Sequence, residues 1–404
     1  MRLFIRLIKT ALCLKNRFIP SVPNWQAPSD RQTWDSSQFY VQSESKSWLT
    51  ENVRCASISG LGADDTAAHV VLSECSQASA TDSKLNTEDS STLVLVQGDS
   101  QEQLLEALAQ CEARIYALPL RNLAAEQYVS SNGKKVKYTV ALLASTQKQL
   151  SQELAAAKVG IGKAIQSGRP WNTPNGSIFS PLSLAGAKIS FVYPGGFASY
   201  VGLGKDIFRL FPEMMETMKT HTNRLDDMMG DRLFHPRTVE ALDNNQVKNL
   251  SRELIHTPIA MFESGICYSK LLTEILSKKF DVKPSSAIGY SMGEISMMYA
   301  MDVWDSADKM SELLHGLPVF RTRLAGPMDT VREAWAIDAS VPDEDIWAGY
   351  TVKAPIQRVQ DVVDTEDKVF LLLINTGNEC VIAGDPVACA RVVKQLDCEN
   401  FIAP

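Results

Sequence analysis

Residues 287–294 read Ala-Ile-Gly-Tyr-Ser-Met-Gly-Glu and place Ser291 at the centre of a Gly-x-Ser-x-Gly pattern. A short apolar run precedes this stretch, and a helix-forming segment, Glu294–Met301, follows it. A serine on a tight strand-to-helix turn holds a strained backbone, and glycines on both sides let neighbouring chain segments pass closely. The turn presents the hydroxyl in a cleft, where the following helix N-terminus favours developing negative charge. The pattern alone fits a nucleophile elbow and a plain strand-to-helix turn equally well.

Length and composition restrict the class of protein. The 404 residues include 45% hydrophobic and 22% charged side chains, which predicts a globular chain of two or three domains. A net charge of -7 without a long basic block argues against nucleic acid as a partner. The eight cysteines are scattered with no C-x-x-C pair, which predicts free thiols in a reducing, cytoplasmic location. Neither cysteines nor histidines have the spacing of metal ligands, so we expect no metal site.

Residues 1–17 are basic and apolar. Arg6, Lys9 and Lys15 interrupt every apolar run, so the segment lacks the hydrophobic stretch of a signal peptide or membrane span. The apolar residues recur at helical spacing, which predicts an amphipathic helix of a folded domain that stops before Pro20. A targeting presequence is the less favoured alternative.

A polar stretch, residues 76–92, is rich in Ser, Thr and Asp and predicts a linker. Beyond it the hydrophobic pattern predicts a small α/β domain over residues 93–186. Its expected strands are 93–97 and 138–144, and its expected helices are 100–112 and 146–165.

A second glycine-rich turn lies upstream of the elbow. Residues 189–193 predict a buried strand that runs into Pro194-Gly195-Gly196, with a helix starting near Leu203. Glycines there let backbone N–H groups approach a ligand, which is the half of an oxyanion hole that an elbow lacks. A strand-loop turn without function explains this segment alone, but the two motifs together are more specific.

The closing part of the chain predicts the order β-α-β-β-α. Its strands are expected at 346–353, 369–374 and 379–384, and its helices at 356–363 and 386–396. This order is typical of a ferredoxin-like subdomain, which we expect over about residues 328–404. Asn375 lies between the second and third strands, in an Asn-Thr-Gly-Asn stretch that also fits a hairpin turn.

These motifs resemble the malonyl/acyl-carrier-protein acyltransferase family, whose hallmarks are a Phe-Pro-Gly-Gln-Gly loop and a Gly-His-Ser-x-Gly-Glu elbow. The resemblance covers residues 187–404 and implies an α/β-hydrolase-like domain with Ser291 as nucleophile. It also implies an oxyanion hole formed by the backbone N–H groups of Gly196 and Met292. Gly196 stands where the family has a glutamine. The glutamine contributes its backbone N–H, which glycine also supplies.

The same resemblance implies several substrate-binding residues. Phe197 replaces a glycine of the loop, and Tyr290 replaces the histidine before the serine, so both are expected to add bulk near the nucleophile. Asn375 falls where the family has an asparagine in the substrate cleft. The interpretation of Asn375 as part of a hairpin turn stays open.

Two further family residues are in doubt. In the family, an arginine about one helix after the serine binds a malonyl carboxylate. An alignment without gaps places Gly316 at that position in this chain. Arg321 and Arg323 lie nearby, so they are the candidate clamp, and without a clamp a plain acyl chain is favoured over malonyl. The histidine of the Ser-His dyad is expected beyond Pro404, so we expect a truncated acyltransferase domain, a fragment with little turnover of its own.

Residues 1–75 resemble the closing part of a ketosynthase, a thiolase-fold domain. The match rests on Gly60, Gly62, Thr66, Ala68 and His69. No ketosynthase catalytic cysteine or histidine is present, so His69 is expected to be structural. We expect exposed apolar surface on this segment, and the resemblance makes residues 93–186 the linker domain between a ketosynthase and an acyltransferase.

The whole arrangement resembles the acyltransferase subunits of omega-3 polyunsaturated fatty acid synthases, which are polyketide-synthase-like. The resemblance implies ping-pong transfer of an acyl or malonyl group from a CoA or carrier-protein thioester, through Ser291, to an acyl carrier protein. The phosphopantetheine belongs to that partner, acyl-CoA is the donor, and no cofactor is held by this chain. Ketosynthase, ketoreductase, dehydratase and enoyl reductase subunits are the other expected partners. The alternatives are a non-catalytic docking or chain-length-setting module and, less favoured, an α/β-hydrolase thioesterase.

Overall fold

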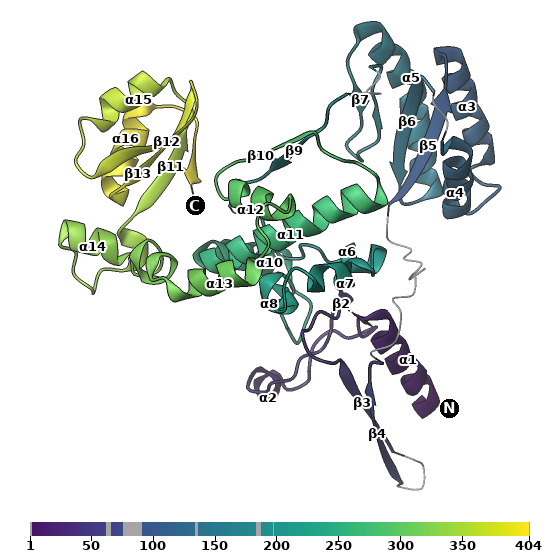
Figure 1. The fold of residues 1–404 in the computed structure, drawn as a ribbon, viewed down its shortest axis with the longest axis horizontal. Coiled ribbons are helices and arrows are strands. Elements are labelled where there is room, and N and C mark those ends of the chain that lie inside the picture. Colours follow the sequence, from purple (N-terminus) through teal and green to yellow (C-terminus); the bar gives the residue numbers. More distant parts are fainter. Residues whose placement is uncertain are drawn as a thin grey trace. The chain divides into compact units, whose positions relative to one another are not determined.

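The computed structural model describes residues 2–61, 66–75, 91–133, 136–182, 187–196 and 198–403 (Figure 1). Contacts divide the chain into two compact units, residues 84–188 and residues 1–83 with 189–404. Helices and strands occur in both units, so the predicted α/β class is confirmed. In the described residues, no helix is both long and apolar enough to cross a membrane.

The unit of residues 84–188 is a four-stranded antiparallel sheet with three helices. The strand order is β5-β6-β8-β7, with β5 (Thr92–Gly98), β6 (Tyr138–Ala144), β7 (Trp171–Asn172) and β8 (Ile178–Phe179). The helices are α3 (Gln101–Arg114), α4 (Leu120–Ser131) and α5 (Gln147–Ser167). The expected strands and two expected helices are confirmed to within a few residues. Helix α4 was not expected, because Pro119 precedes it without a side-chain cap that would mark its start.

The N-terminal part of the other unit begins with a helix and contains a hairpin. The predicted amphipathic helix is confirmed as α1 (Arg2–Asn16), and the hairpin pairs β3 (Cys55–Leu61) with β4 (Ala67–Ser73). Between them lie β1 (Phe18–Ile19), α2 (Arg31–Asp35) and β2 (Lys46–Ser47). Phe4 and Ile5 of α1 and Leu61 and Val71 of the hairpin are largely exposed, so the expected exposed apolar surface is confirmed.

A helical layer follows in the same unit. It contains α6 (Ile207–Leu210), α7 (Met214–Lys219), α8 (Leu225–Met228), α9 (Asp231–Phe234), α10 (Asn244–Glu253), α11 (Pro258–Lys279) and α13 (Ala307–Gly316). Figure 1 shows α11 as the long green helix of this unit. Ile266 and Leu271 of α11 are fully buried against methionines of α7 and α8, which form much of this core.

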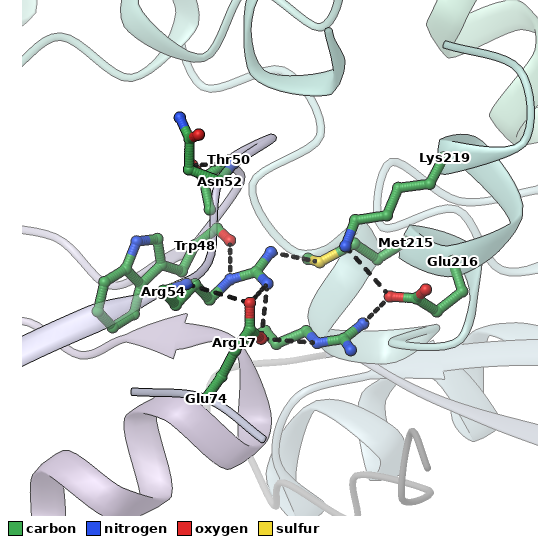
Figure 2. A network of polar contacts seen from close by, with 9 residues as sticks. All are labelled: Arg17, Trp48, Thr50, Asn52, Arg54, Glu74, Met215, Glu216 and Lys219. Atoms are coloured by element: carbon green, nitrogen blue, oxygen red, sulfur yellow. Dashed lines mark hydrogen bonds and ion pairs between the residues drawn. The ribbon is translucent and has the colours of Figure 1, made fainter. Parts of the chain in front are cut away.

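A buried ion pair joins the two ends of the N-terminal hairpin, and the polar network around it reaches α7, as Figure 2 shows. The Arg54 side chain is 0% exposed and donates to both Glu74 carboxylate oxygens at 3.0 and 2.9 Å. It also donates to the Trp48 carbonyl at 2.8 Å and lies 3.1 Å from the Met215 sulfur. Removal of a guanidinium from water is unfavourable, so this network is needed to satisfy its charge and its donors.

A second buried pair joins the N-terminal segment to α9. Lys46 donates to Asp231 at 2.8 Å, and both side chains are almost completely buried. Arg17 extends the first network, because its guanidinium lies 3.7 Å from Glu74 and pairs with Glu216 of α7. Residues 1–75 therefore contact the helical layer through charged groups as well as apolar ones.

The two motif strands pair in parallel. Strand β9 (Ser190–Tyr193) lies beside β10 (Ser286–Gly289), and helix α12 (Gly293–Ala300) follows β10. The prediction that the first of these strands is buried was wrong, because Val192 is 72% exposed. In the part of the chain that the structure describes, these strands pair only with each other. The predicted helix start near Leu203 was also wrong, since Gly202 and Gly204 have positive φ angles of 91° and 74° and α6 begins at Ile207.

The C-terminal part, yellow-green in Figure 1, is a four-stranded antiparallel sheet with two helices. The elements are β11 (Ala348–Val352), α15 (Ile356–Val363), β12 (Val369–Thr376), β13 (Glu379–Gly384), α16 (Pro386–Leu396) and β14 (Asn400–Ala403). The sheet order is β12-β13-β11-β14, so the observed succession is β-α-β-β-α-β. A core that includes Val352, Ile382 and Leu396 joins the helices to one face of this sheet.

We predict that Glu74→Gln destabilises the folded chain by about 3 kcal/mol, because it leaves the buried Arg54 charge without its partner. Burial would raise the pKa of Glu74, but hydrogen bonds and charge from Arg54 outweigh it, so the pKa lies below its ordinary 4.5. Because the pKa of Glu74 is lower in the folded chain than in the unfolded chain, its ionised carboxylate stabilises the fold at pH values above about 4.5. This contribution to the free energy of unfolding is lost as the pH falls below about 4.5. Denaturant unfolding from pH 7 to pH 3 measures both effects.

The matched control is Glu216→Gln in the same network. Glu216 is 49% exposed, so its loss is expected to change the free energy of unfolding by less than about 1 kcal/mol. Equal losses for both variants would contradict the assignment of Arg54 and Glu74 as the buried ion pair of this network.

Candidate active site

The elbow has the backbone geometry that its sequence predicts. Ser291 lies between β10 and α12 with φ of 53°, a left-handed conformation that non-glycine residues rarely adopt. The Gly293 N–H donates to the Tyr290 carbonyl at 2.8 Å, and the Glu294 N–H donates to the Ser291 carbonyl at 3.0 Å. Ser291 is exposed. The turn therefore holds a strained serine at the surface in front of a helix.

Both glycines of the pattern are required by close backbone contacts. A Cβ on Gly293 would lie 2.3 Å from the Tyr193 carbonyl oxygen and 2.6 Å from that of Pro194. A Cβ on Gly289 would lie 2.3 Å from the Glu294 nitrogen. These distances are too short for any side chain, so the start of α12 can pack on β9 only with glycine at both positions.

The glycine loop after β9 lies beside the serine. The Tyr290 N–H donates to the Tyr193 carbonyl at 3.1 Å, which extends the parallel pairing into the elbow. A Cβ built on Gly195 would lie 3.4 Å from the Ser291 Cβ, whereas one on Gly196 would meet nothing within 4 Å. The structure thus brings the two motifs together and leaves open space at Gly196. Phe197 lies outside the described residues.

The predicted oxyanion-hole donors are Gly196 and Met292. Within the described residues, neither backbone N–H donates to another protein group. Met292 is the N-cap residue of α12, so its N–H lies at the positive end of the helix dipole. A tetrahedral oxyanion requires such unpaired backbone donors, and the assignment of these two N–H groups to an oxyanion hole stays a prediction.

A hydrogen-bond chain joins the elbow to the C-terminal sheet. The Tyr290 hydroxyl donates to the Asn375 side-chain oxygen at 2.8 Å. The Asn375 amide in turn donates to the Glu379 carboxylate at 3.2 Å, which fixes the orientation of that amide. The structure therefore brings together two of the predicted substrate-binding residues. Glu379 was not predicted, because a glutamate at the start of a strand carries no sequence signal for a site.

The two candidate arginines have other partners. Both lie in the π-helical turn η2 (Val319–Arg323). Arg321 donates to the His315 carbonyl at 3.2 Å, and Arg323 donates to Glu333 at 2.7 Å. In the described residues, neither side chain contacts Ser291.

Helix α11 connects η2 to the elbow. The Phe320 ring of η2 packs on Phe262 of α11 with ring centroids 5.2 Å apart. Gly265 packs on the elbow itself, because a Cβ there would lie 2.6 Å from the Met292 methyl carbon. Phe262 and Gly265 are neighbours along one face of α11, separated by about one turn. The arginine segment is therefore close to the site, without being paired to it.

Two of the histidines have polar partners away from the elbow. The His69 Nδ1 lies 2.7 Å from the Ser59 hydroxyl on the N-terminal hairpin. The His315 Nε2 lies 3.1 Å from the buried Glu263 carboxylate. Both contacts explain these residues without a role at Ser291.

The other histidines are equally remote from catalysis. Burial lowers the pKa of His221 and of His235, so both are neutral at pH 7. His256 is exposed in the short turn η1 (Leu254–His256). All five histidines of the sequence are described, and none forms a hydrogen bond with Ser291. The described residues therefore present an exposed, strained serine, and none of the five histidines is hydrogen-bonded to it.

No protein-family model matches this chain. Among curated proteins, a polyunsaturated fatty acid synthase subunit of Thraustochytrium sp. is 29% identical over 96% of this chain. The chain resembles such a synthase subunit. A phenolphthiocerol/phthiocerol polyketide synthase subunit of Mycobacterium tuberculosis is 26% identical over 74% of the chain. The matches cover 20% and 19% of those two relatives, so the chain spans about a fifth of their length.

Solved structures give weaker likenesses. The acyltransferase domain of SpnD, in complex with 2-(pent-4-yn-1-yl)malonyl, is 16% identical with a TM-score of 0.49. That match covers 77% of this chain and 64% of the other. The acyltransferase domain of ZmaA has the same identity and TM-score, over 79% of this chain and 66% of the other.

We predict that Gly293→Ala destabilises the fold by about 3 kcal/mol, because its methyl group would overlap two carbonyl oxygens of the adjacent segment. Gly196→Ala is the matched control, since its methyl group meets open space and is expected to change stability by less than about 0.5 kcal/mol. Denaturant unfolding of both variants measures the difference. Equal stability of the two variants would contradict the elbow packing.

Backbone strain at Ser291 predicts a gain in stability when the residue becomes glycine. Ser291→Gly is expected to be about 1 kcal/mol more stable than Ser291→Ala, because only glycine adopts the left-handed conformation without strain. Both variants lack the hydroxyl, so the comparison isolates the backbone term. Thermal unfolding measures it, and a more stable alanine variant would refute the strain.

Proposed function

We propose that this chain carries the nucleophile and oxyanion hole of an acyltransferase that moves an acyl group from a thioester to an acyl carrier protein. The observation that supports this most directly is the strained, exposed Ser291 beside the free N–H groups of Gly196 and Met292. A serine held in this way is typical of acyl transfer through a covalent ester. The similarity to synthase subunits that build fatty acids and polyketides supports the same chemistry.

The proposed reaction has two half-reactions. The Ser291 hydroxyl attacks the thioester carbonyl, and the N–H groups stabilise the resulting oxyanion. Collapse forms the C–O ester bond, breaks the C–S bond and releases the CoA thiol, which receives the serine proton through a base. The phosphopantetheine thiol of the carrier protein then attacks the ester: the C–S bond forms, the C–O bond breaks, and the proton of this thiol passes to the Ser291 oxygen.

The base is the open element of this proposal. No described side chain hydrogen-bonds to Ser291, so the hydroxyl keeps its proton and is a weak nucleophile. We propose that a histidine supplies this role, although none of the five described histidines is hydrogen-bonded to Ser291. The Tyr290–Asn375 contact supports a substrate-positioning role for both residues, and Phe197 is proposed to line the same pocket. Arg321 and Arg323 stay proposed carboxylate ligands, although their present partners favour an uncharged acyl chain.

The remaining segments fit the same assembly. We propose that residues 1–75 are the closing part of a ketosynthase-like domain, with His69 structural on its hairpin. Residues 93–186 are proposed as the linker domain, and 187–404 as the acyltransferase domain with its inserted subdomain. Ketosynthase, ketoreductase, dehydratase and enoyl reductase subunits are the proposed partners, in the cytoplasm.

A docking or chain-length-setting module of the same synthase is the second candidate. The absence of a base among the described residues is the observation that favours it. The two candidates differ in whether Ser291 reacts with a thioester.

We predict that the chain forms a covalent acyl adduct at Ser291 when incubated with acetyl-CoA, detectable by intact-mass spectrometry. The adduct forms slowly, and added imidazole is expected to accelerate it by about 100-fold, the lower range for general-base catalysis. Because imidazole and acetyl-CoA form N-acetylimidazole, which acylates other side chains, peptide mapping is needed to locate the adduct.

The control is Ser291→Ala, which keeps the fold and removes the hydroxyl. Loss of the mapped adduct in this variant supports the transferase. If the folded wild-type chain forms no adduct at Ser291 with any donor, with or without imidazole, the docking module is the better assignment.

A further inference from the structure

The C-terminal sheet has one face without helices, here called the open face. Cross-strand register assigns its side chains, because directly paired residues point to the same side. One row pairs Phe370, Ala383, Gly349 and Ala403, and the next pairs Leu373, Val381, Thr351 and Phe401. The intervening residues, including Ile382 and Val352, are in the core with α15 and α16. The open face is therefore an apolar surface.

The larger side chains of the open face lie on its two edge strands, and the row of small residues beside them is here called the trough. Phe370, Leu373 and Phe401 are each about half exposed, while Ala383, Gly349 and Ala403 form the row. Apolar side chains of this size on a sheet are unfavourable in water and indicate an apolar partner. Ala383 is only 2% exposed, so the apolar surface available to a partner is that of the larger side chains.

One end of the open face is closed by stacked aromatic rings. Trp347, which precedes β11, stacks on Phe370 with an interplanar angle of 15° and a centroid distance of 6.5 Å. Trp335 also stacks on Trp347, with ring centroids 5.7 Å apart. The Lys368 ammonium lies 5.1 Å from the Trp335 ring centre and marks the outer limit of the stack.

The other end of the open face meets the candidate active site. Asn375 of β12 accepts the Tyr290 hydrogen bond, and Tyr290 is the residue before Ser291. Glu379 pairs with Thr376 across the strands and accepts from Asn375. The apolar trough therefore begins near the nucleophile, with a negative group beside its entrance.

A pair of opposite charges lies farther along the same face, toward β14. Lys353 continues the alternation of β11, and its ammonium lies 5.1 Å from the Phe401 ring centre. The same ammonium pairs with the Glu399 carboxylate at 3.2 Å. These two charges neutralise each other, so they leave the side of the trough that carries Phe370 and Leu373 apolar.

The length of the trough suits a hydrocarbon chain. From Asn375 to Phe370 the strand spans about 15 Å at the rise of a β-strand. An extended chain of about twelve carbon atoms has this length at roughly 1.3 Å per atom. A malonyl group, in contrast, is too short to use the trough and would bring its carboxylate toward Glu379.

We propose that the open face binds the hydrocarbon tail of a medium- to long-chain acyl thioester whose carbonyl lies at Ser291. The tail runs from Asn375 along Leu373 to the Phe370–Trp347–Trp335 stack. Glu379 disfavours a dicarboxylic acyl group by like-charge repulsion. This inference rests on the proposed acyltransferase site for the position of the carbonyl, and the apolar trough and its length specify the substrate class.

The test uses the full chain with Ser291→Ala, so that binding is measured without turnover. Equilibrium binding of dodecanoyl-CoA, acetyl-CoA and malonyl-CoA is followed by tryptophan fluorescence and by calorimetry. Dodecanoyl-CoA is expected to bind at least about tenfold more tightly than acetyl-CoA, the ratio given by burying roughly two methylene groups. Glu379→Gln is expected to strengthen malonyl-CoA binding several-fold relative to acetyl-CoA binding.

Two matched substitutions locate the tail. Leu373→Glu places a charge beside the trough and is expected to abolish the preference for dodecanoyl-CoA. Val387→Glu adds the same charge at an exposed apolar position on α16, in the helix layer that covers the opposite face, and is expected to keep it. Far-UV circular dichroism of both variants verifies that the fold is retained.

Several outcomes would overturn the proposal. Equal binding of dodecanoyl-CoA and acetyl-CoA excludes a tail site, and a preference that survives Leu373→Glu places the tail elsewhere. If sedimentation shows a dimer that Leu373→Glu dissociates, a second copy covers the face instead. The adduct assay at Ser291 tests the transferase separately, so tail binding without an adduct would refute only the proposed function.

Discussion

The contact between Gly293 and the carbonyl oxygens of Tyr193 and Pro194 is the constraint on which the candidate site depends. It seats the first turn of α12 directly on the end of β9, and this leaves Ser291 no backbone conformation except a strained one. The same contact brings the glycine loop to the serine, so one packing contact positions both sequence motifs. The geometry of the candidate site is therefore set by backbone packing more than by side-chain contacts.

Buried ion pairs lie in a different part of the same unit. Arg54 and Lys46 are buried with their carboxylate partners where the N-terminal segment meets the helical layer. Such pairs add little net stability compared with apolar packing of the same volume, but they strongly penalise arrangements in which either partner is unpaired. The Lys46–Asp231 pair therefore specifies how residues 1–75 dock, and the Arg54–Glu74 pair closes the base of the hairpin itself. The methionine-rich core around α11 supplies the adaptable apolar contact.

The local elements were the most predictable part of the fold, because hydrophobic spacing directly encodes helices such as α5 and strands such as β6. The elbow was equally predictable from the sequence, because only glycine fits the close backbone contacts at positions 289 and 293. Burial of β9 was misjudged, because an apolar run does not reveal whether another segment covers it. Glu379 was missed for a related reason: its importance comes from a cross-strand neighbour, Asn375, and pairing register is not visible in a single strand.

Strand β12 departs from regular pairing twice, between Leu371 and Leu373 and between Ile374 and Thr376. Each irregularity inserts one residue and so exchanges the two faces of the strand beyond it. Together they restore the original alternation, which is why Phe370 and Thr376 share a face while the odd-numbered Leu373 between them also points there. Deletion of an inserted residue would therefore leave the remaining cross-strand pairs on their present faces in a regular ladder, whereas deletion of a paired residue would turn the strand beyond it over.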